Sequence, residues 1–153
     1  MSHLACARDG AICDAYASAR LPDGRGSEMT DHEAIARLID VYCSVWNEPD
    51  PARRAAMLEP IWGDDATYTD PRSDVRGTAE FLAHITSIVS AREGAQILRT
   101  SVVDAHHRLA RFEWQAVDAA GTTLLDGIDF VEIAPDGRIQ KVVGFFGPLT
   151  AQE

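Results

Sequence analysis

The stretch "GIDFVEIAPDGRIQKVVGFFGP", residues 127–148, decides the fold of this chain. It contains most of one run of strand-forming residues, 122–133, and the whole of a second, 138–146, on either side of the turn sequence Pro-Asp-Gly. A turn this short returns the chain beside itself. The stretch therefore predicts two adjacent antiparallel strands.

Asp129 is the unusual residue of this stretch. It shares one predicted strand face with Leu125, Gly127, Val131 and Ile133, and it is the single carboxylate there. If that face lines a dry cavity, the loss of water favours the protonated carboxyl, which can donate a hydrogen bond. If the face is partly wet, Asp129 stays ionised. The pattern leaves both interpretations open.

Two more strands are predicted upstream, over residues 95–105 and 109–117, joined through a His-His-Arg turn. In the second of them Phe112, Trp114 and Ala116 alternate with polar residues, so one face should be buried and the other wet. With the two strands of the opening stretch, they make four long antiparallel strands.

Two helices are predicted near the N-terminus. Thr30 and Glu33 fit a capping box, so the first helix should begin at Thr30. Its inner face carries apolar and aromatic residues at spacings of three and four, namely Ile35, Leu38, Ile39, Tyr42 and Trp46. A second helix should follow the cap residue Asp50 and break near Pro60.

Residues 64–71, "DDATYTDP", predict a short strand that ends at Asp70. A third helix should follow from Gly77 to Gly94. Asp-Pro is common in turns, which gives Asp70 a purely structural interpretation. The alternative is a carboxylate held at the strand end for chemistry, on the same face as Tyr68.

Helices followed by strands indicate an α+β fold with the two kinds of element in separate layers. Residues 29–150 are predicted to form one domain. Residues 1–28 are Ala-rich, then polar and turn-forming, and are predicted to be a poorly ordered extension.

Composition excludes some classes of function. The net charge of −10 argues against nucleic acid as a partner and against an anionic membrane surface. The three cysteines show no pairing pattern, and no apolar run is long enough to span a membrane, so a cytoplasmic location is predicted. No histidine pair has metal-ligand spacing and no phosphate-binding glycine loop is present. We therefore predict no metal and no cofactor.

Two more residues could contribute to a site. Tyr42 lies in the middle of the inner face of the first helix, where a buried phenol needs a hydrogen-bond partner, although most core tyrosines are structural. His84 lies near the apolar face of the third helix and could reach a cavity. A lone histidine at the edge of a core is more often structural.

Three segments together resemble the nuclear-transport-factor-2-like superfamily, which includes the SnoaL-like polyketide cyclases and the ketosteroid isomerases. They are "GDDATYTDP" (63–71), "RGTAEFLAHI" (76–85) and the opening stretch, and the resemblance covers roughly residues 30–148. It implies a cystatin-like cone, in which a strongly curved antiparallel sheet wraps around three helices and encloses an apolar pocket. It also implies a homodimer packed through the sheet.

By resemblance to the ketosteroid isomerases, Asp70 corresponds to the general base that moves a proton between carbons. Tyr42 and Asp129 correspond to the pair that holds the enolate oxygen. Phe146 corresponds to a ring lining the pocket. We expect Tyr68, His84, Trp114 and Phe146 to contact a small hydrophobic ligand or substrate.

The resemblance leaves the function open, because this fold also hosts proteins without catalysis. The tyrosines that support the oxyanion tyrosine in the isomerases are replaced here, with Trp62 and the region of His84 as the equivalents. The alternative function is a small-molecule-binding or assembly module, with the pocket open or filled by Trp46, Trp62, Trp114 and Phe145. Epoxide hydrolysis, as in the limonene-epoxide hydrolases, would need an Asp-Arg-Asp set. Arg99 is a candidate for its arginine, but no such set is evident.

Overall fold

The computed structural model describes residues 25–152, with side chains from residue 31 onward. Most of the predicted 1–28 extension thus lies outside the described residues. The described elements are α2 (Arg25–Asn47), α3 (Pro51–Leu58), β1 (Trp62–Asp70), β2 (Ser73–Arg76), α4 (Gly77–Ala91), β3 (Gln96–Arg99), β4 (Asp104–His106), β5 (Leu109–Val117), β6 (Thr123–Ile133) and β7 (Ile139–Phe146). Three helices and a sheet confirm the predicted α+β class.

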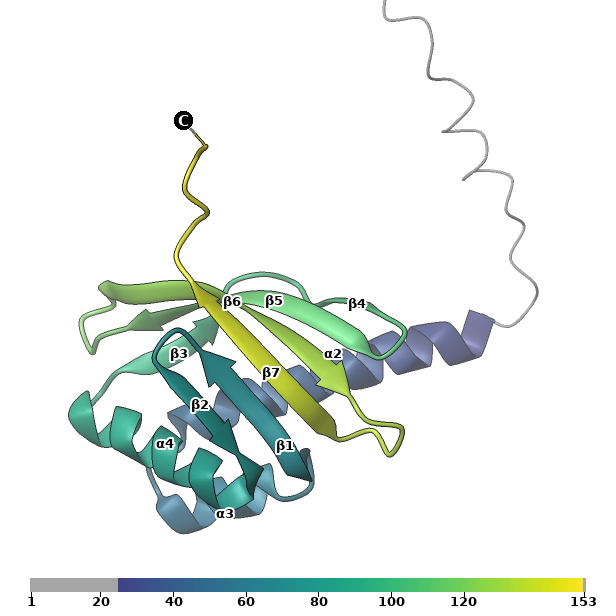
Figure 1. Ribbon diagram of the computed structural model, residues 1–153, viewed down its shortest axis with the longest axis horizontal. Coiled ribbons are helices and arrows are strands. Elements are labelled where there is room, and N and C mark those ends of the chain that lie inside the picture. The colour runs from purple at the N-terminus through teal and green to yellow at the C-terminus, as the bar shows by residue number, and fades with distance from the viewer. Residues whose placement is uncertain (1–24, 153) are drawn as a thin grey trace, which may run out of the picture. The chain divides into compact units, whose positions relative to one another are not determined.

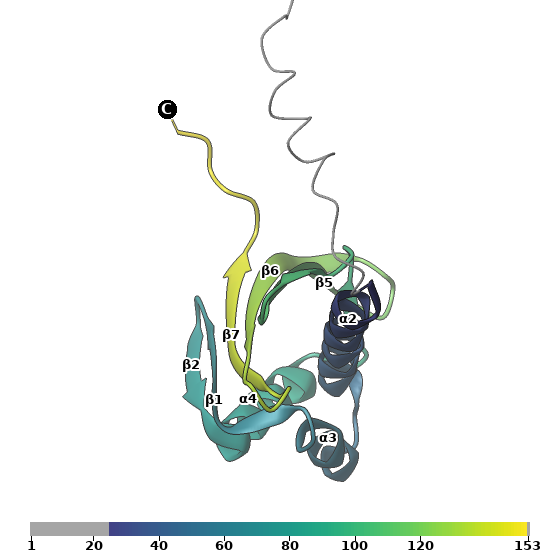
Figure 2. The same ribbon diagram turned by 90° about the vertical axis from the view of Figure 1, so that its right-hand side faces the viewer.

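The sheet has the strand order β2-β1-β7-β6-β5-β3, with β4 also paired to β5. It curls so that α2 lies against its concave side (Figures 1 and 2). One pairing differs from the expected all-antiparallel sheet, because β1 runs parallel to β7. The helix α4 and strands β3–β6 separate these two strands along the chain, so no short turn imposes the antiparallel arrangement.

The helix boundaries were predicted unevenly. The second helix starts as expected, because the Asp50 side chain accepts a hydrogen bond from the Arg53 N–H and Pro51 occupies the first position. The prediction that the first helix begins at Thr30 is wrong, since α2 begins at Arg25. Glu28 and Met29 are good helix formers, so the helix continues upstream through the supposed capping box.

The predicted strand 95–105 is interrupted. Ser101 lies between β3 and β4, and its Oγ accepts the Glu113 N–H at 2.8 Å. A side chain thus takes the place of a backbone carbonyl in the ladder, and the pairing with β5 stops until Asp104. The turn after β4 contains His107 in the left-handed region, with φ of 55°.

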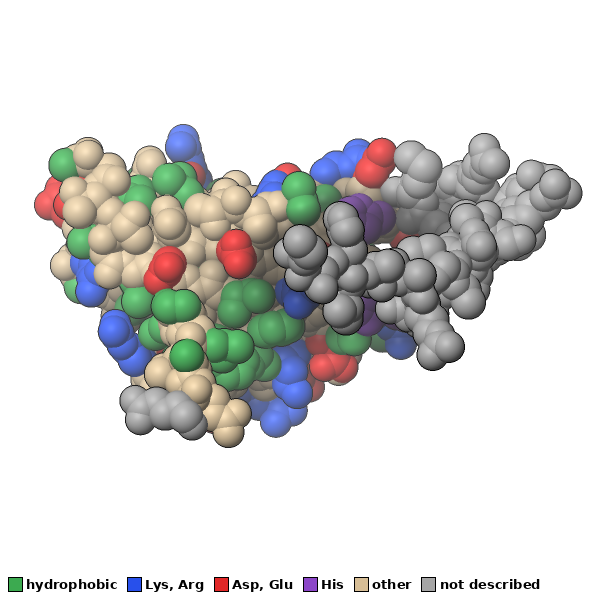
Figure 3. Space-filling view, turned by 90° about the horizontal axis from the view of Figure 1, so that it is seen from above, with side chains coloured by type: hydrophobic (Ala, Val, Ile, Leu, Met, Phe, Trp, Pro, Cys, Tyr) green, Lys and Arg blue, Asp and Glu red, His purple; other side chains and the backbone are tan. Residues whose placement is uncertain are grey.

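The core lies between the concave side of the sheet and the helices. Its centre is an aromatic stack in which Trp62 lies 4.2 Å from Phe81, and Tyr42 packs parallel to both rings. On the other side of the sheet, Phe130 and Phe145 are exposed and contact each other edge to face. In Figure 3, which shows the sheet from above, hydrophobic side chains gather near the middle of the face. None of the described helices combines the length and apolar composition needed to cross a membrane.

Candidate functional site

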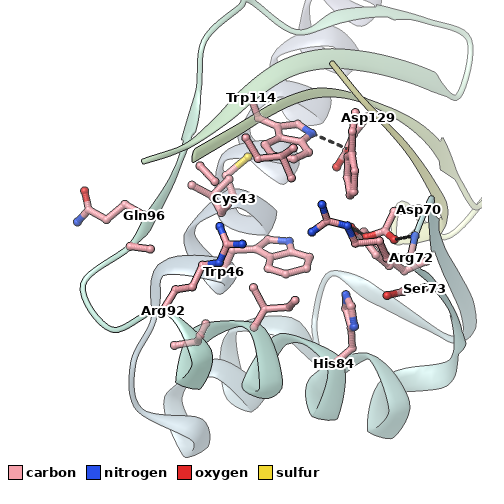
Figure 4. A pocket seen from close by; sticks show the side chains of 18 of the residues that line it. Cys43, Trp46, Asp70, Arg72, Ser73, His84, Arg92, Gln96, Trp114 and Asp129 are labelled. Carbon is pink, nitrogen blue, oxygen red and sulfur yellow. Dashed lines mark hydrogen bonds between the residues drawn. The ribbon is translucent and has the colours of Figure 1, made fainter. Parts of the chain in front are cut away.

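A cavity of about 160 Å³ opens between the concave side of the sheet and helices α2 and α4 (Figure 4). All seven residues predicted for a site line it: Tyr42, Tyr68, Asp70, His84, Trp114, Asp129 and Phe146. They come from six different elements, α2, β1, α4, β5, β6 and β7. The structure therefore brings together residues that are far apart in the sequence.

Asp70 and Asp129 are brought near each other by strand register. Gly144 of β7 is paired with Asp129 of β6, and Val143 is paired with Thr69 of β1, which places Asp70 on the other side of Gly144. A Cβ built on Gly144 would lie 2.9 Å from Asp129 Oδ1 and 3.5 Å from Asp70 Cβ. The glycine thus leaves open the space between the two carboxyl groups.

Asp129 is almost fully buried, with 5% of its surface exposed. The Trp114 Nε1–H donates to its Oδ1 at 2.9 Å, and the Tyr42 hydroxyl donates to its Oδ2 at 3.4 Å. Burial raises the pKa of Asp129 to about 6, although the hydrogen bonds from Trp114 and Tyr42 oppose the shift. The direction is that expected for a carboxyl on a dry apolar face.

The contact from Trp114 depends on a second glycine. Trp114 is paired with Gly127 across β5 and β6, and a Cβ at Gly127 would lie only 2.6 Å from the indole atom Cζ2. Without that Cβ, the indole can lie across β6 and reach Asp129, two residues further along the strand. The sequence predicts Trp114 only as a ligand contact. Its hydrogen bond was missed because ring orientation depends on this close approach.

Asp70 is half-buried and ends β1. The Tyr68 hydroxyl donates to Asp70 Oδ2 at 2.8 Å, and the Arg72 backbone N–H donates to Asp70 Oδ1 at 2.8 Å. The second contact is the turn predicted from Asp-Pro. The two interpretations of Asp70 are therefore compatible, since the turn holds the carboxyl group at the cavity.

The two phenols are held in the aromatic core. Burial is the main reason why the pKa of Tyr42 lies well above its ordinary value, and the nearby Asp129 raises it further. Burial also raises the pKa of Tyr68, followed by the effects of Asp129 and Asp70. Both hydroxyls therefore keep their protons at neutral pH and can act as hydrogen-bond donors.

His84 contributes its ring to the same wall. Its ring centroid lies 5.3 Å from that of Tyr68 and 5.9 Å from that of Trp46. Burial lowers the pKa of His84, against the opposing effect of Asp70. The imidazole is therefore mainly neutral at pH 7.

The alternative site arrangements are not seen among the described residues. Trp46 and Trp114 line the cavity without filling it, while Trp62 lies in the core and Phe145 on the outer side of the sheet. Arg99 pairs with Asp40, at 2.7 Å, and does not line the cavity. Within residues 31–152, no three His, Cys, Asp or Glu side chains are grouped as a metal site would require.

Some lining residues were not predicted, namely Cys43, Arg72, Ser73, Arg92 and Gln96. Cys43 follows Tyr42 on α2, and burial raises the pKa of its thiol to about 12, so it is not a reactive thiolate. The other four surround the opening. They lie at the ends of β1 and α4 or at the start of β2 and β3, where sequence periodicity gives little guidance.

The SnoaL-like domain model matches residues 39–142, which is more than half of the chain. A candidate isomerase of the SnoaL-like family from Agrobacterium tumefaciens str. C58 is 28% identical, with a TM-score of 0.72, and the match covers 78% of this chain and 99% of that one. A protein of unknown function with a cystatin-like fold from Methylobium petroleophilum PM1 is 22% identical, with a TM-score of 0.63 and coverage of 79% and 80%.

A candidate SnoaL-like polyketide cyclase from Jannaschia sp. CCS1 is 9% identical, with a TM-score of 0.56 and coverage of 71% of this chain and 84% of that one. At this identity the similarity shows the fold alone, as it does for the Methylobium protein. No match was found among curated proteins.

Proposed function

Because this chain belongs to the SnoaL-like domain family, we propose that it binds a small carbonyl compound and moves a proton from the carbon next to the carbonyl, as an isomerase or a cyclase does. The observation that carries the proposal is the placement of Asp70 and Asp129 on either side of Gly144, facing one cavity. Enolate chemistry needs a base near the carbon that loses its proton and a hydrogen-bond donor near the carbonyl oxygen of the same molecule.

Asp70 is the base in this proposal. Its carboxylate takes a proton from the carbon next to the carbonyl, and the electron pair of the C–H bond forms the enolate. In an isomerisation, Asp70 returns the same proton to another carbon of the conjugated system. In a cyclisation, the enolate carbon instead attacks a second carbonyl of the same molecule, and the oxygen of that carbonyl takes the proton from Asp70 to become a hydroxyl group. Neither path needs a further reactant.

Tyr42 and Asp129 hold the enolate oxygen. The pKa of Asp129 is about 6, so the carboxyl is protonated in mildly acidic solution. In that form it keeps the bond from Trp114 at Oδ1 and carries its proton on Oδ2, from which it can donate to the ligand. The Tyr42 hydroxyl is held only loosely, at 3.4 Å, and can turn to the same oxygen. Each donor of this kind typically contributes on the order of 10²–10³ in rate.

The size of the cavity indicates a small ligand. An apolar cavity of about 150 Å³ holds a molecule the size of benzene, and this cavity measures about 160 Å³. Its walls combine aromatic rings, Trp46, Phe112 and Trp114 among them, with aliphatic side chains such as Ile97 and Leu125. These features support a ketone of one ring rather than a fused-ring steroid.

A binding module without catalysis is the second candidate. It is favoured by the fact that the polar groups of the cavity are paired with one another, Tyr42 with Asp129 and Tyr68 with Asp70. A protein that only binds a metabolite could keep these two hydrogen bonds intact, because none of the four side chains would have to take part in a reaction. The same experiment separates the two functions.

The test uses cyclohex-3-enone, a one-ring β,γ-unsaturated ketone. The full chain should convert it to the conjugated enone, followed by ultraviolet absorbance, and in D₂O should introduce deuterium next to the carbonyl, followed by NMR. Asp70→Asn should slow both processes by about 10²–10⁴-fold, the usual contribution of a general base. Asp65→Asn, which changes an exposed carboxylate on the same strand, is the matched control and should have no effect.

Unchanged turnover in Asp70→Asn would remove Asp70 from the role of base. If a panel of one-ring ketones binds by calorimetry but none isomerises or exchanges, the binding module is the correct function.

A further inference from the structure

Two arginines stand at the opening of the cavity. Arg72 follows β1 and Arg92 follows α4, and both are exposed residues that line the cavity. In Figure 4 their guanidinium groups point from opposite sides toward the space in front of Trp46. Ser73 and Gln96 lie beside them at the same opening. The opening is therefore polar and cationic, whereas the walls of the cavity are mainly apolar.

Neither guanidinium is neutralised by the part of the chain that the structure describes. Four other arginines, Arg37, Arg99, Arg111 and Arg138, each form an ion pair with a described carboxylate. Arg72 and Arg92 form none, and no described hydrogen bond uses their side chains. Arg53, Arg76 and Arg108 have no described ion pair either, but they do not line the cavity. Arg72 and Arg92 differ in that they place two positive charges at one opening of a chain with 24 acidic and 14 basic residues.

Arg72 is also held in place. Its guanidinium carbon lies 5.3 Å from the centre of the Phe146 ring, a cation–π contact. Phe146 in turn packs edge to face on Trp114, which holds Asp129. A single ring thus separates the charged opening from the indole that contacts the buried carboxyl group. This spacing suits a ligand with one ring between its carbonyl and a charged end.

The cavity lining also contains the titratable groups of Asp70, Asp129 and His84. Asp70 and Asp129 contribute up to two negative charges, and His84 is mainly neutral at pH 7. Against them stand the two positive charges of Arg72 and Arg92. With Asp129 ionised the charges of the cavity lining cancel, and with Asp129 protonated the lining is positive, whereas the chain as a whole carries −10. The positive charge is concentrated at the opening, where a ligand enters.

We propose that the ligand carries a carboxylate, which Arg72 and Arg92 hold at the opening while its carbonyl reaches Asp129 and Tyr42. The substrate class is a one-ring oxo-carboxylic acid. Guanidinium groups match the planar, two-oxygen geometry of a carboxylate. This inference rests on the proposed function for the position of the carbonyl, whereas the carboxylate position rests on the two arginines alone.

Calorimetry with 3-oxocyclohexanecarboxylate and its neutral carboxamide tests the inference. The full chain should bind the carboxylate at least about tenfold more tightly, which is the worth of one charge-assisted hydrogen bond. Arg72→Gln and Arg92→Gln should each remove about tenfold of affinity for the carboxylate and leave the carboxamide unchanged. Added salt should weaken binding of the carboxylate alone. Arg108→Gln, an exposed arginine that does not line the cavity, is the matched control.

Equal affinity for the two ligands, or no detectable binding of the carboxylate, would overturn the inference. The inference would also be overturned if the arginine variants weakened binding of both ligands equally, because that result indicates lost packing rather than lost charge. Turnover of the neutral cyclohex-3-enone, measured on the same variants, reports separately on the proposed function. If turnover is absent but the carboxylate preference remains, the proposed function fails and the anion site stands.

Discussion

At the scale of single residues, the buried carboxyl group of Asp129 makes the stability of the fold depend on pH. Its pKa of about 6 lies above the ordinary 3.8 because the side chain is buried. The folded protein therefore holds this proton more tightly than the unfolded chain does. The stabilisation is complete below pH 4 and is lost as the pH rises from about 4 to about 6.

Asp129→Asn should remove this dependence on pH. The amide oxygen can still accept the bond from Trp114, and no charge is buried at any pH. Relative to the wild type, the free energy of unfolding of the variant should rise by up to about 3 kcal/mol between pH 4 and pH 8, since the shift is about two pKa units. Urea unfolding at several pH values measures it.

Asp126→Asn is the control, because Asp126 is an exposed carboxylate on the same strand. The same pH dependence in Asp129→Asn and in the wild type would mean that Asp129 is not the group responsible.

The site residues were predictable to different degrees. Asp129 could be found because it interrupts an apolar strand face, and Asp70 because it ends a strand. The roles of Gly127 and Gly144 were not predictable, since their importance lies in side chains of neighbouring strands. Arg72 and Arg92 were missed because nothing in their local sequence distinguishes them from other exposed arginines.

At the scale of elements, the closeness of β5, β6 and β7 is set by these two glycines. Gly127→Ala would place a Cβ 2.5 Å from the Phe145 carbonyl oxygen and 2.6 Å from Trp114. Gly144→Ala would meet mainly the Asp129 carboxyl oxygen, at 2.9 Å. The Phe145 carbonyl and the packed Trp114 indole can move away from an added Cβ less easily than the end of the Asp129 side chain can.

We therefore expect Gly127→Ala to cost about 2–3 kcal/mol of stability, near the upper end for overpacking, and Gly144→Ala to cost less. Gly144→Ala should still weaken ligand binding, because it displaces Asp129 and fills the space beside it. Chemical unfolding and calorimetry measure the two effects. Gln140→Ala, an exposed change on β7, is the control. The reverse order of stability would show that the indole adapts more easily than the carboxyl group.

The elements themselves were mostly predictable, because their periodicity is strong. The structure differs from the predicted sheet in two places, and the periodicity of the sequence cannot predict the physical cause of either. The parallel pairing of β1 with β7 depends on the path of the whole chain. The gap between β3 and β4 depends on one serine hydroxyl that replaces a backbone acceptor.

At the scale of the whole described molecule, the outer side of the sheet has a shallow groove lined by Phe130, Val143, Arg111 and Lys141, among others. Phe130 is 41% exposed and Phe145 beside it is 55% exposed. The groove also carries Asp104 and Glu132, so that charges of both signs surround the aromatic pair. A surface of mixed charge around an apolar centre can complement a second copy of itself.

We propose that two copies associate through this side of the sheet, as the resemblance implied. Phe145→Ser should shift the protein from dimer to monomer, measured by size-exclusion chromatography with light scattering. Val102→Ser, which changes a residue that is 82% exposed in the loop between β3 and β4, should leave the dimer intact. A wild-type protein that is monomeric at high micromolar concentration would contradict the proposal.

The parallel pairing of β1 with β7 has a consequence for the order in which the protein is made. Among the described strands, the β1–β2 pair joins the rest of the sheet only through β7, the last of them. Some seventy further residues must be synthesised after Asp70 before Gly144 is available. Only then can the pairing with β7 bring Asp70 beside Asp129. A nascent chain that stops before β7 contains both carboxyl groups but lacks Gly144 and Phe146, so its cavity is incomplete. The proposed chemistry therefore requires that β7 has paired with both β1 and β6.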